Sequence, residues 1–102
     1  MTNFQIQYWH DIPVLVRAKE GKERMSAQLP ARFMEAVDSA AMAAGLVGSD
    51  EYLRAFHWSE PENRAGTPEH VANEVATELD QLWPVIDWKT TAALARSASA
   101  SR

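Results

Sequence analysis

The chain has no cysteine among its 102 residues. Disulfides, thiolate nucleophiles and thiolate metal ligands are therefore all excluded. Long apolar runs are absent too, because no stretch approaches the roughly eighteen residues that a membrane-spanning helix needs. The first residues, up to Gln5, lack a basic region followed by an apolar run, so we expect no signal peptide. These absences predict a cytoplasmic protein.

Positive charge is also scarce. Ten basic residues stand against fourteen acidic residues, which gives a net charge of −4. Nucleic-acid-binding proteins normally carry a clustered basic face, and no run of basic residues longer than two occurs here. A basic patch for a membrane surface is missing for the same reason. We therefore expect neither a nucleic acid nor a membrane as partner.

Hydrophobic and aromatic residues are plentiful. They include four tryptophans, and the hydrophobic share of 46% suits one compact domain with a modest core. Tryptophan dominates the energetics of cores and of interfaces alike. We expect a single α+β domain over residues 1–96, a disordered tail over 97–102, and some aromatic surface left for a protein partner.

The N-terminal third predicts strands. Apolar and polar residues alternate over residues 4–11, which is typical of a half-buried strand, and Pro13 ends this pattern. Residues 15–19 and 23–29 form two more extended stretches around a turn at Gly21. The sequence thus predicts a three-stranded antiparallel meander.

Strand alternation also divides the segment before Pro13 between two faces. Tyr8 and His10 fall on the same face as Ile6, which is the expected core face. Trp9 and Asp11 fall on the opposite face. We therefore predict that Trp9 and Asp11 contact a partner.

The rest of the chain predicts helices. From Pro30 the apolar residues recur at helical spacing until Gly45, which is suited to end a helix. Further helices are expected over 49–58, over 67–82 and, shorter, over about 87–96. The fold class is therefore α+β, with a small N-terminal antiparallel sheet of about three strands packed against three to four helices.

No catalytic signature is visible. The chain has no phosphate-binding loop, no nucleophile elbow and no distinctive carboxylate pair. His10 and Asp11 could form an acid–base pair, but neighbours on a strand point to opposite faces. The structural alternative is a histidine at the edge of the core and an aspartate that caps the next turn. We predict no catalytic residue, and a non-enzyme is favoured over an enzyme.

The histidines offer one alternative function. His70 and Glu74 are four residues apart and share a helix face, but a metal site needs more ligands. Only His10 and His57 could supply further imidazoles. A solvated helix face explains the pair without a metal. We predict no metal and no cofactor, and the alternative is a small metal- or ligand-binding enzyme that uses His10, His57 and His70.

Three tryptophans besides Trp9 are candidates for a partner surface. Trp83 and Trp88 bracket Pro84 outside any clean apolar stripe. Trp58 closes the predicted helix over 49–58, where its alternative role is to pack that helix on the sheet. The predicted partner-binding residues are Trp9, Asp11, Trp58, Trp83 and Trp88.

Several segments keep a distinctive order and spacing. They are Tyr8-Trp9-His10-Asp11-Ile12-Pro13, Leu29-Pro30-Ala31-Arg32-Phe33, Glu35-Ala36-Val37-Asp38, Ala41-Met42-Ala43-Ala44-Gly45-Leu46 and Ser49-Asp50-Glu51-Tyr52-Leu53. The pattern resembles the small bacterial "virulence factor" domain family over about residues 6–58. On this resemblance, residues 67–96 are expected to be a helical extension specific to this chain.

The resemblance implies an interaction module, without catalytic residues to carry over. It suggests a non-catalytic accessory subunit of a larger bacterial enzyme assembly, in one-carbon or methyl-transfer metabolism. The C-terminal helix and the tryptophans would then reach onto the partner enzyme. A homodimer that pairs through an exposed strand edge of the sheet is a third alternative.

Overall fold

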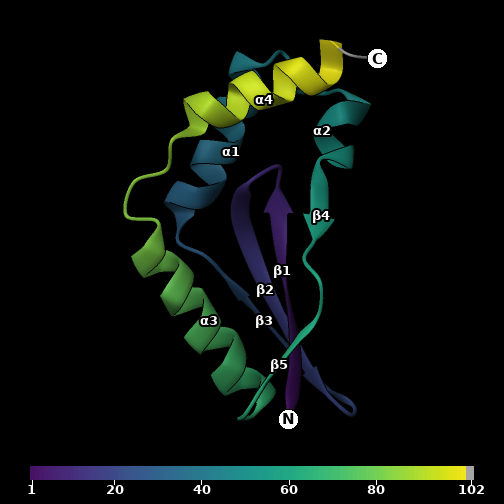
Figure 1. The fold of residues 1–102 in the computed structure, drawn as a ribbon, viewed down its shortest axis with the longest axis vertical. Helices are drawn as coiled ribbons and strands as arrows, with labels where there is room; N and C mark the ends of the chain where they lie inside the picture. Colours follow the sequence, from purple (N-terminus) through teal and green to yellow (C-terminus); the bar gives the residue numbers. More distant parts are fainter. Residues whose placement is uncertain (101–102) are drawn as a thin grey trace.

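The computed structural model describes residues 1–100 and has the predicted α+β architecture (Figure 1). Its elements are β1 (Thr2–Trp9), β2 (Ile12–Glu20), β3 (Glu23–Gln28), α1 (Ala31–Ala43), α2 (Asp50–Arg54), β4 (Phe56–Trp58), β5 (Glu62–Arg64), α3 (Pro68–Leu82) and α4 (Trp88–Ala100). An antiparallel sheet is thus packed against four helices, as the sequence predicts.

The sheet has the strand order β3-β2-β1-β4, and β5 also pairs with β1. All pairs are antiparallel, and β1, β2 and β3 form the predicted meander. The two short strands β4 and β5 occupy the free side of β1, one near each of its ends. Within residues 1–100, β3 is therefore the one long strand with an unpaired edge.

The predicted helix over 49–58 is wrong in its second half. Helix α2 ends at Arg54, and Phe56–Trp58 forms β4 instead. The amide N–H of His10 donates to the carbonyl oxygen of Ala55 over 3.2 Å, and the ladder with β1 continues from there. Backbone groups at the free side of β1 need partners, and this segment supplies them. Strand β5 lies between the predicted helices over 49–58 and 67–82, where no strand is predicted.

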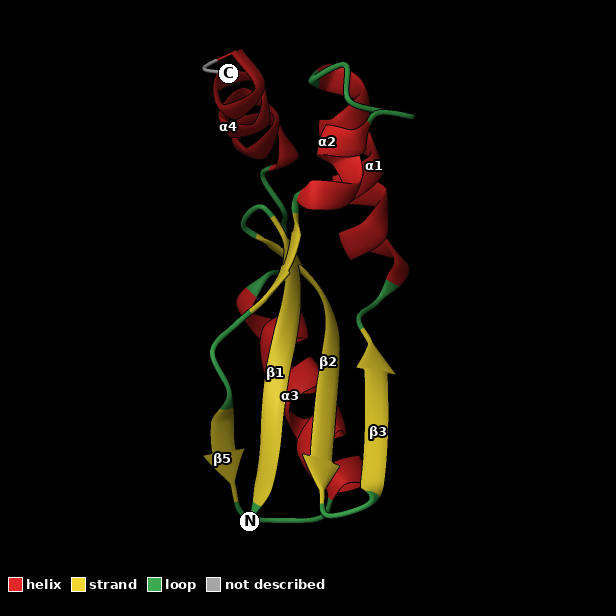
Figure 2. Ribbon diagram, turned by 90° about the vertical axis from the view of Figure 1, so that its right-hand side faces the viewer, coloured by secondary structure: helices red, strands yellow, loops and turns green. Residues whose placement is uncertain are grey.

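Helix α3 covers one face of the sheet. Figure 2 shows α3 behind β1, β2 and β3, with no helix in front of their lower halves. The buried side chains between them are aliphatic or aromatic and come from alternate strand positions: Phe4, Ile6, Val16 and Ala18 on the sheet and Val71, Ala72, Val75 and Leu79 on α3. One face of the sheet is therefore core, and the lower part of the other face is bare.

The remaining helices α1, α2 and α4 gather at the far end of the sheet (Figures 1 and 2). Helices α1 and α4 pack on each other, and the buried residues they contribute are mostly alanine, which lets the helices approach closely. Helix α4 continues to Ala100, so it includes residues 97–100 of the predicted disordered tail. Residues 101–102 of that tail lie outside the described residues.

Candidate partner-binding site

Trp9 is fully buried, with 0% of its surface exposed. Its indole Nε1–H donates to the carbonyl oxygen of Tyr52 over 2.9 Å, and the two rings lie 5.9 Å apart. The prediction that Trp9 lies on a surface is therefore wrong. Alternation does place Trp9 opposite Ile6, but helix α2 packs against Trp9 at this end of the sheet.

Asp11 also makes a contact within the fold. Its Oδ1 accepts a hydrogen bond of 2.6 Å from the Thr91 hydroxyl, and Thr91 is buried. This contact ties α4 to the turn between β1 and β2. Asp11 does not meet the other predicted partner-binding residues, and its partner is 80 residues away in the sequence.

His10 and His57 are neighbours at the same end of the sheet. Nε2 of His57 lies 2.8 Å from the carbonyl oxygen of His10. Burial lowers the pKa of His10, Asp11 opposes that shift, and His57 adds to it. His10 also has a positive φ of 53°, a conformation that a β-carbon disfavours.

His70 lies far from the other two histidines. It stands in the first turn of α3, whose N-cap region meets the start of β1, whereas His10 follows the end of β1. There His70 Nε2 lies 3.1 Å from Glu74. Within residues 1–100 no three histidine, aspartate or glutamate side chains are placed to hold a metal ion together. The three histidines therefore do not form one site.

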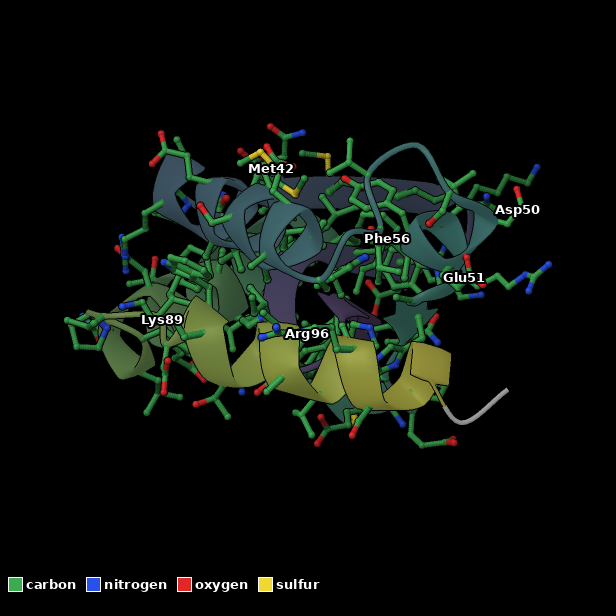
Figure 3. The ribbon with its side chains drawn as sticks, turned by 90° about the horizontal axis from the view of Figure 1, so that it is seen from above. Met42, Asp50, Glu51, Phe56, Lys89 and Arg96 are labelled. Atoms are coloured by element: carbon green, nitrogen blue, oxygen red, sulfur yellow. The ribbon has the colours of Figure 1, made fainter. Side chains whose placement is uncertain are left out.

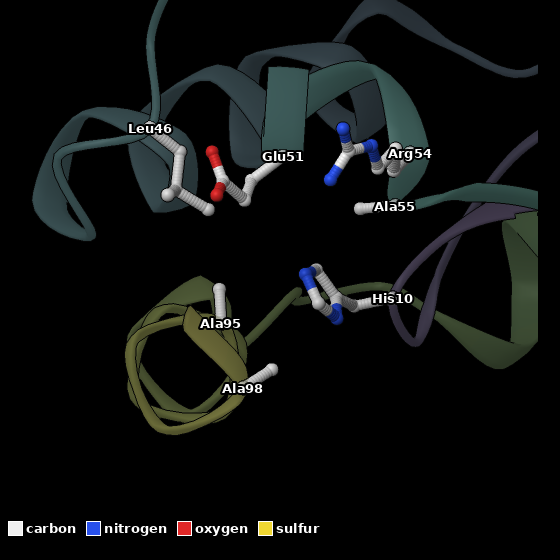
Figure 4. Close-up of a pocket in the computed structure, with 7 residues that line it drawn as sticks. All are labelled: His10, Leu46, Glu51, Arg54, Ala55, Ala95 and Ala98. Atoms are coloured by element: carbon white, nitrogen blue, oxygen red, sulfur yellow. The ribbon is translucent and has the colours of Figure 1, made fainter. Parts of the chain in front are cut away.

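A small hollow of about 140 Å³ lies between α2, α4 and the turn that carries His10 (Figure 4). The imidazole of His10 reaches into the gap between the two helices, where Ala95 and Ala98 form the opposite wall. Glu51 and Arg54 reach it from α2. The volume resembles that of a cavity which holds a benzene ring, so only a small molecule would fit.

A larger concave surface follows the outer side of α1. It consists of two adjoining hollows of about 460 and 480 Å³ that share Asp38, and we call it the α1 groove. Its lining residues are Gln7, Val14, Leu15, Gln28, Leu29, Ala31, Met34, Glu35, Asp38, Phe56, Met42, Val47, Gly48 and Tyr52. Each hollow has a volume typical of ligand or peptide pockets.

Two methionines line the α1 groove. Met34, Asp38 and Met42 follow one another at four-residue spacing along α1, so they share one side of the helix. That side points away from α4, as the position of Met42 shows in Figure 3. Met42 is 65% exposed and Val47 is 64% exposed. Methionine adapts to irregular partners and is common at surfaces that bind other proteins.

Tyr52 gives the apolar end of the groove a polar group. Burial, and then the negative charge of Asp38, raise the pKa of its phenol above the usual range. The phenol is therefore protonated at neutral pH and remains a hydrogen-bond donor beside the Asp38 carboxylate.

The bare face of the sheet adjoins the α1 groove. Paired residues of antiparallel strands share a face, and the pairing defines this open sheet face as Asn3, Gln5, Gln7, Leu15, Arg17, Lys19, Arg24, Ser26, Gln28, Trp58 and Asn63. Gln7, Leu15 and Gln28 belong to both surfaces.

Trp58 is the predicted partner-binding residue that lies on the open sheet face. It is half-buried, and the guanidinium of Arg17 stacks over its ring at 4.0 Å. Gln5 fixes this arrangement, because its Oε1 accepts from Arg17 Nη2 over 2.9 Å while its Nε2 donates to the Ser59 carbonyl oxygen over 3.0 Å. An aromatic ring is thus held in place at the border of the α1 groove.

Trp83 and Trp88 lie elsewhere. They flank the connection between α3 and α4, on the other side of the sheet from β4 (Figure 1). Both are half-buried against the core, and the carbonyl oxygen of Trp83 accepts from Arg32 Nη2 over 2.9 Å. Nearby Val85 is 83% exposed. The structure therefore does not bring the predicted tryptophans together into one surface.

The residues that line the α1 groove were missed by the sequence analysis. One signal for them exists: Met34 and Met42 lie off the apolar stripe of Phe33, Val37 and Ala40 that faces the core. Large apolar side chains on the polar side of an amphipathic helix indicate a second contact surface.

The fold and this surface define a small α+β protein with one sheet face covered and the other open beside a groove. The chain belongs to the virulence factor family, whose model matches residues 7–90. The match includes α3 and the start of α4, so the expectation that residues 67–96 are an extension specific to this chain is wrong for residues 67–90. No curated protein and no solved structure matches the chain. Among residues 1–100, no helix has the length and apolar character needed to cross a bilayer.

Proposed function

We propose that the chain is a non-catalytic, partner-binding accessory subunit that docks on a larger protein through the α1 groove. The observation that carries this proposal is the line of exposed apolar side chains Met34, Met42 and Val47 along the groove. Trp58 extends the same surface onto the open sheet face.

The energetics favour a protein partner. Burying a methionine or valine side chain completely is worth about 1.5–3 kcal/mol. Met42 and Val47 are each about two-thirds exposed, so a partner that covers them gains on the order of 1–2 kcal/mol from each. Exposed apolar side chains gathered in a groove are typical of interaction surfaces.

The chemistry of the groove favours binding over catalysis. None of its lining residues is a histidine, serine, threonine or lysine. Its ionisable groups are Glu35, Asp38 and the protonated Tyr52. Such a set holds and orients a partner, but it offers no nucleophile with a neighbouring base.

The larger partner is proposed to be an enzyme of a bacterial assembly, in one-carbon or methyl-transfer metabolism. This part of the proposal rests on the family resemblance alone. In such an assembly the chain would contribute binding surface and stability, while the partner enzyme carries the chemistry.

Co-purification from the native host tests the proposal. The wild-type chain, a Met42→Glu variant and a Leu94→Glu control are each tagged and expressed at native level. Leu94 is 51% exposed on α4, so its substitution adds the same charge at a similarly exposed site off the groove. We expect wild type and Leu94→Glu to retain one large partner in fixed proportion, and Met42→Glu to lose it.

The opposite pattern would reject the proposed surface. Loss of the partner with Leu94→Glu but not with Met42→Glu would place docking on α4. Circular dichroism of both variants checks that they are folded. Stoichiometric zinc or iron in the purified wild-type protein would instead favour the alternative of a small metal enzyme.

A further inference from the structure

The open sheet face carries positive charge and no negative charge. Its cations are Arg17, Lys19 and Arg24, all exposed. The other residues of this face are amides, a serine, a leucine and Trp58, with no aspartate or glutamate among them. This composition contrasts with the chain as a whole, whose acidic residues outnumber its basic residues by fourteen to ten.

Two of these cations face each other directly. Lys19 and Arg24 are opposite partners in the β2–β3 ladder, and Asn3 is the neighbour of Lys19 on β1. Like charges at opposite positions of a sheet destabilise it. No neighbouring strand supplies a carboxylate that would offset this repulsion on the same face.

Three other arginines among residues 1–100 form ion pairs with acids. Each of these ion pairs joins an arginine to one or two carboxylates: Arg32 with Asp80, Arg54 with Asp50, and Arg64 with Glu74 and Glu78. Within residues 1–100, none of the three cations of the open sheet face lies within 4.0 Å of a carboxylate. Their positive charge is therefore available to an external anion.

Arg17 is also held in a fixed orientation. Gln5 accepts a hydrogen bond from one of its nitrogens, and the Trp58 ring supports the guanidinium plane at 4.0 Å. A guanidinium has five N–H donors, so others remain for a ligand. A pre-oriented arginine loses less side-chain entropy when it binds a carboxylate.

We propose that the partner that occupies the α1 groove also lays an acidic segment across the open sheet face, where its carboxylates pair with Arg17, Lys19 and Arg24. This inference rests on the proposed function and names the chemistry of the partner. Complementary charge at an interface chiefly sets the specificity and the rate of association.

An acidic protein segment fits this face better than a nucleic acid does. Proteins that bind single-stranded RNA on an open sheet stack bases on two or three aromatic rings. Here Trp58 is the one aromatic side chain of the open sheet face, and Arg17 already covers it. Three cations in a chain of net charge −4 also give a weak field for a polyanion.

The test measures binding of a synthetic twelve-residue peptide in which glutamate alternates with threonine. The full chain is labelled with ¹⁵N and titrated with this peptide, and with a twelve-nucleotide poly-U RNA in a parallel series. The double variant Lys19→Gln/Arg24→Gln is compared with Lys89→Gln/Arg96→Gln, which removes two exposed cations from α4. Both variants lower the net charge by two, so only the position of the lost charge differs.

The proposal predicts that amide shifts map to β2 and β3, and that the Trp58 indole N–H signal moves with them. The sheet-face variant should weaken peptide binding at least tenfold, and the α4 variant by less than twofold. Equal weakening by both variants would overturn the proposal, because the attraction would then be unspecific. RNA binding tighter than peptide binding with the same residue dependence would also overturn it. Absence of binding by both probes would overturn the proposal as well, and would leave the three cations the role of protecting the bare face and the β3 edge from self-association.

Docking in the α1 groove and binding of an acidic segment can be refuted independently of each other. Met42→Glu should leave binding of the glutamate peptide unchanged, because Met42 is not part of the open sheet face. If Met42→Glu leaves the native partner bound, docking in the α1 groove is refuted. If the sheet-face variant retains the native partner while Met42→Glu loses it, only the acidic segment is refuted.

Discussion

The indole Nε1–H of Trp9 donates a hydrogen bond to the backbone carbonyl oxygen of Tyr52 over 2.9 Å, across 43 residues of sequence. Trp9 belongs to β1 and Tyr52 to α2, so this bond fixes the helix over the end of the sheet. The same contact positions the Tyr52 ring, which lines the α1 groove. A core residue thereby shapes the proposed binding surface.

Replacing Trp9 by phenylalanine should therefore destabilise the fold. The variant keeps an aromatic ring but leaves the Tyr52 carbonyl oxygen without its donor, which costs about 1–3 kcal/mol. Chemical denaturation followed by circular dichroism measures this loss in the free energy of unfolding. Trp58→Phe is the matched control, because Trp58 is half-buried on the open sheet face. Equal losses in the two variants would contradict the assigned role of Trp9.

The sequence predicts strands β1, β2 and β3, the helices and the side of β1 on which Trp9 lies. It does not predict what covers that side. Alternation indicates only that Trp9 is opposite Ile6, whereas Trp9 is buried with the help of α2, which comes much later in the chain. The hydrogen bond between Asp11 and Thr91 spans 80 residues, so a local sequence pattern cannot predict it either.

Strand β4 illustrates a second limit. The run Phe56 to Trp58 is aromatic and only three residues long, so its periodicity fits a helix end as well as a strand. Pairing with β1 decides between the two, and pairing is a tertiary effect. The consequence for the site is direct, because β4 carries Trp58 onto the open sheet face.

Thr91→Val should loosen α4. Valine has nearly the shape of threonine but cannot donate to Asp11, so the variant loses a buried hydrogen bond worth about 1 kcal/mol. Hydrogen–deuterium exchange measures the effect, and amides of α4 from Ala92 to Ala95 should exchange roughly fivefold faster. Asp11→Asn keeps an acceptor oxygen and should change exchange less. Unchanged exchange in Thr91→Val would show that the bond does not hold the helix.

Arg64 should govern the acid sensitivity of the link between β5 and α3. A hydrogen bond from Arg64, together with the nearby charges of His70 and Arg64, lowers the pKa of Glu74. A lowered carboxyl pKa stabilises the fold above the unfolded value of about 4.3, and this stabilisation is lost as the pH falls through the folded value. NMR titration should show the Glu74 pKa rising towards its usual value in Arg64→Met. The difference in the free energy of unfolding between wild type and Arg64→Met should shrink at acid pH. A difference that stays constant with pH would refute this role of the contact between Arg64 and Glu74.

His10 should add a second dependence of the stability of the fold on pH. Burial lowers its folded pKa, so the unfolded chain binds the proton more readily. Stability is then fully present above the unfolded value of about 6.5 and decreases as the pH falls below it. Asparagine tolerates the positive φ at this position. Thermal melts between pH 5 and 7.5 should therefore show that the melting temperature falls less with decreasing pH in His10→Asn than in wild type. An equal dependence of the melting temperature on pH in both proteins would exclude this role for His10.

Photocrosslinking in living cells tests the proposed docking surface most directly. The photoreactive amino acid p-benzoylphenylalanine replaces Met42 in one variant and Leu94 in a second. After irradiation, we expect Met42→p-benzoylphenylalanine to yield one discrete adduct with a large protein, and the Leu94 variant to yield none. An adduct from the Leu94 position alone, or no adduct from the Met42 position while the partner still co-purifies, would contradict docking through the α1 groove.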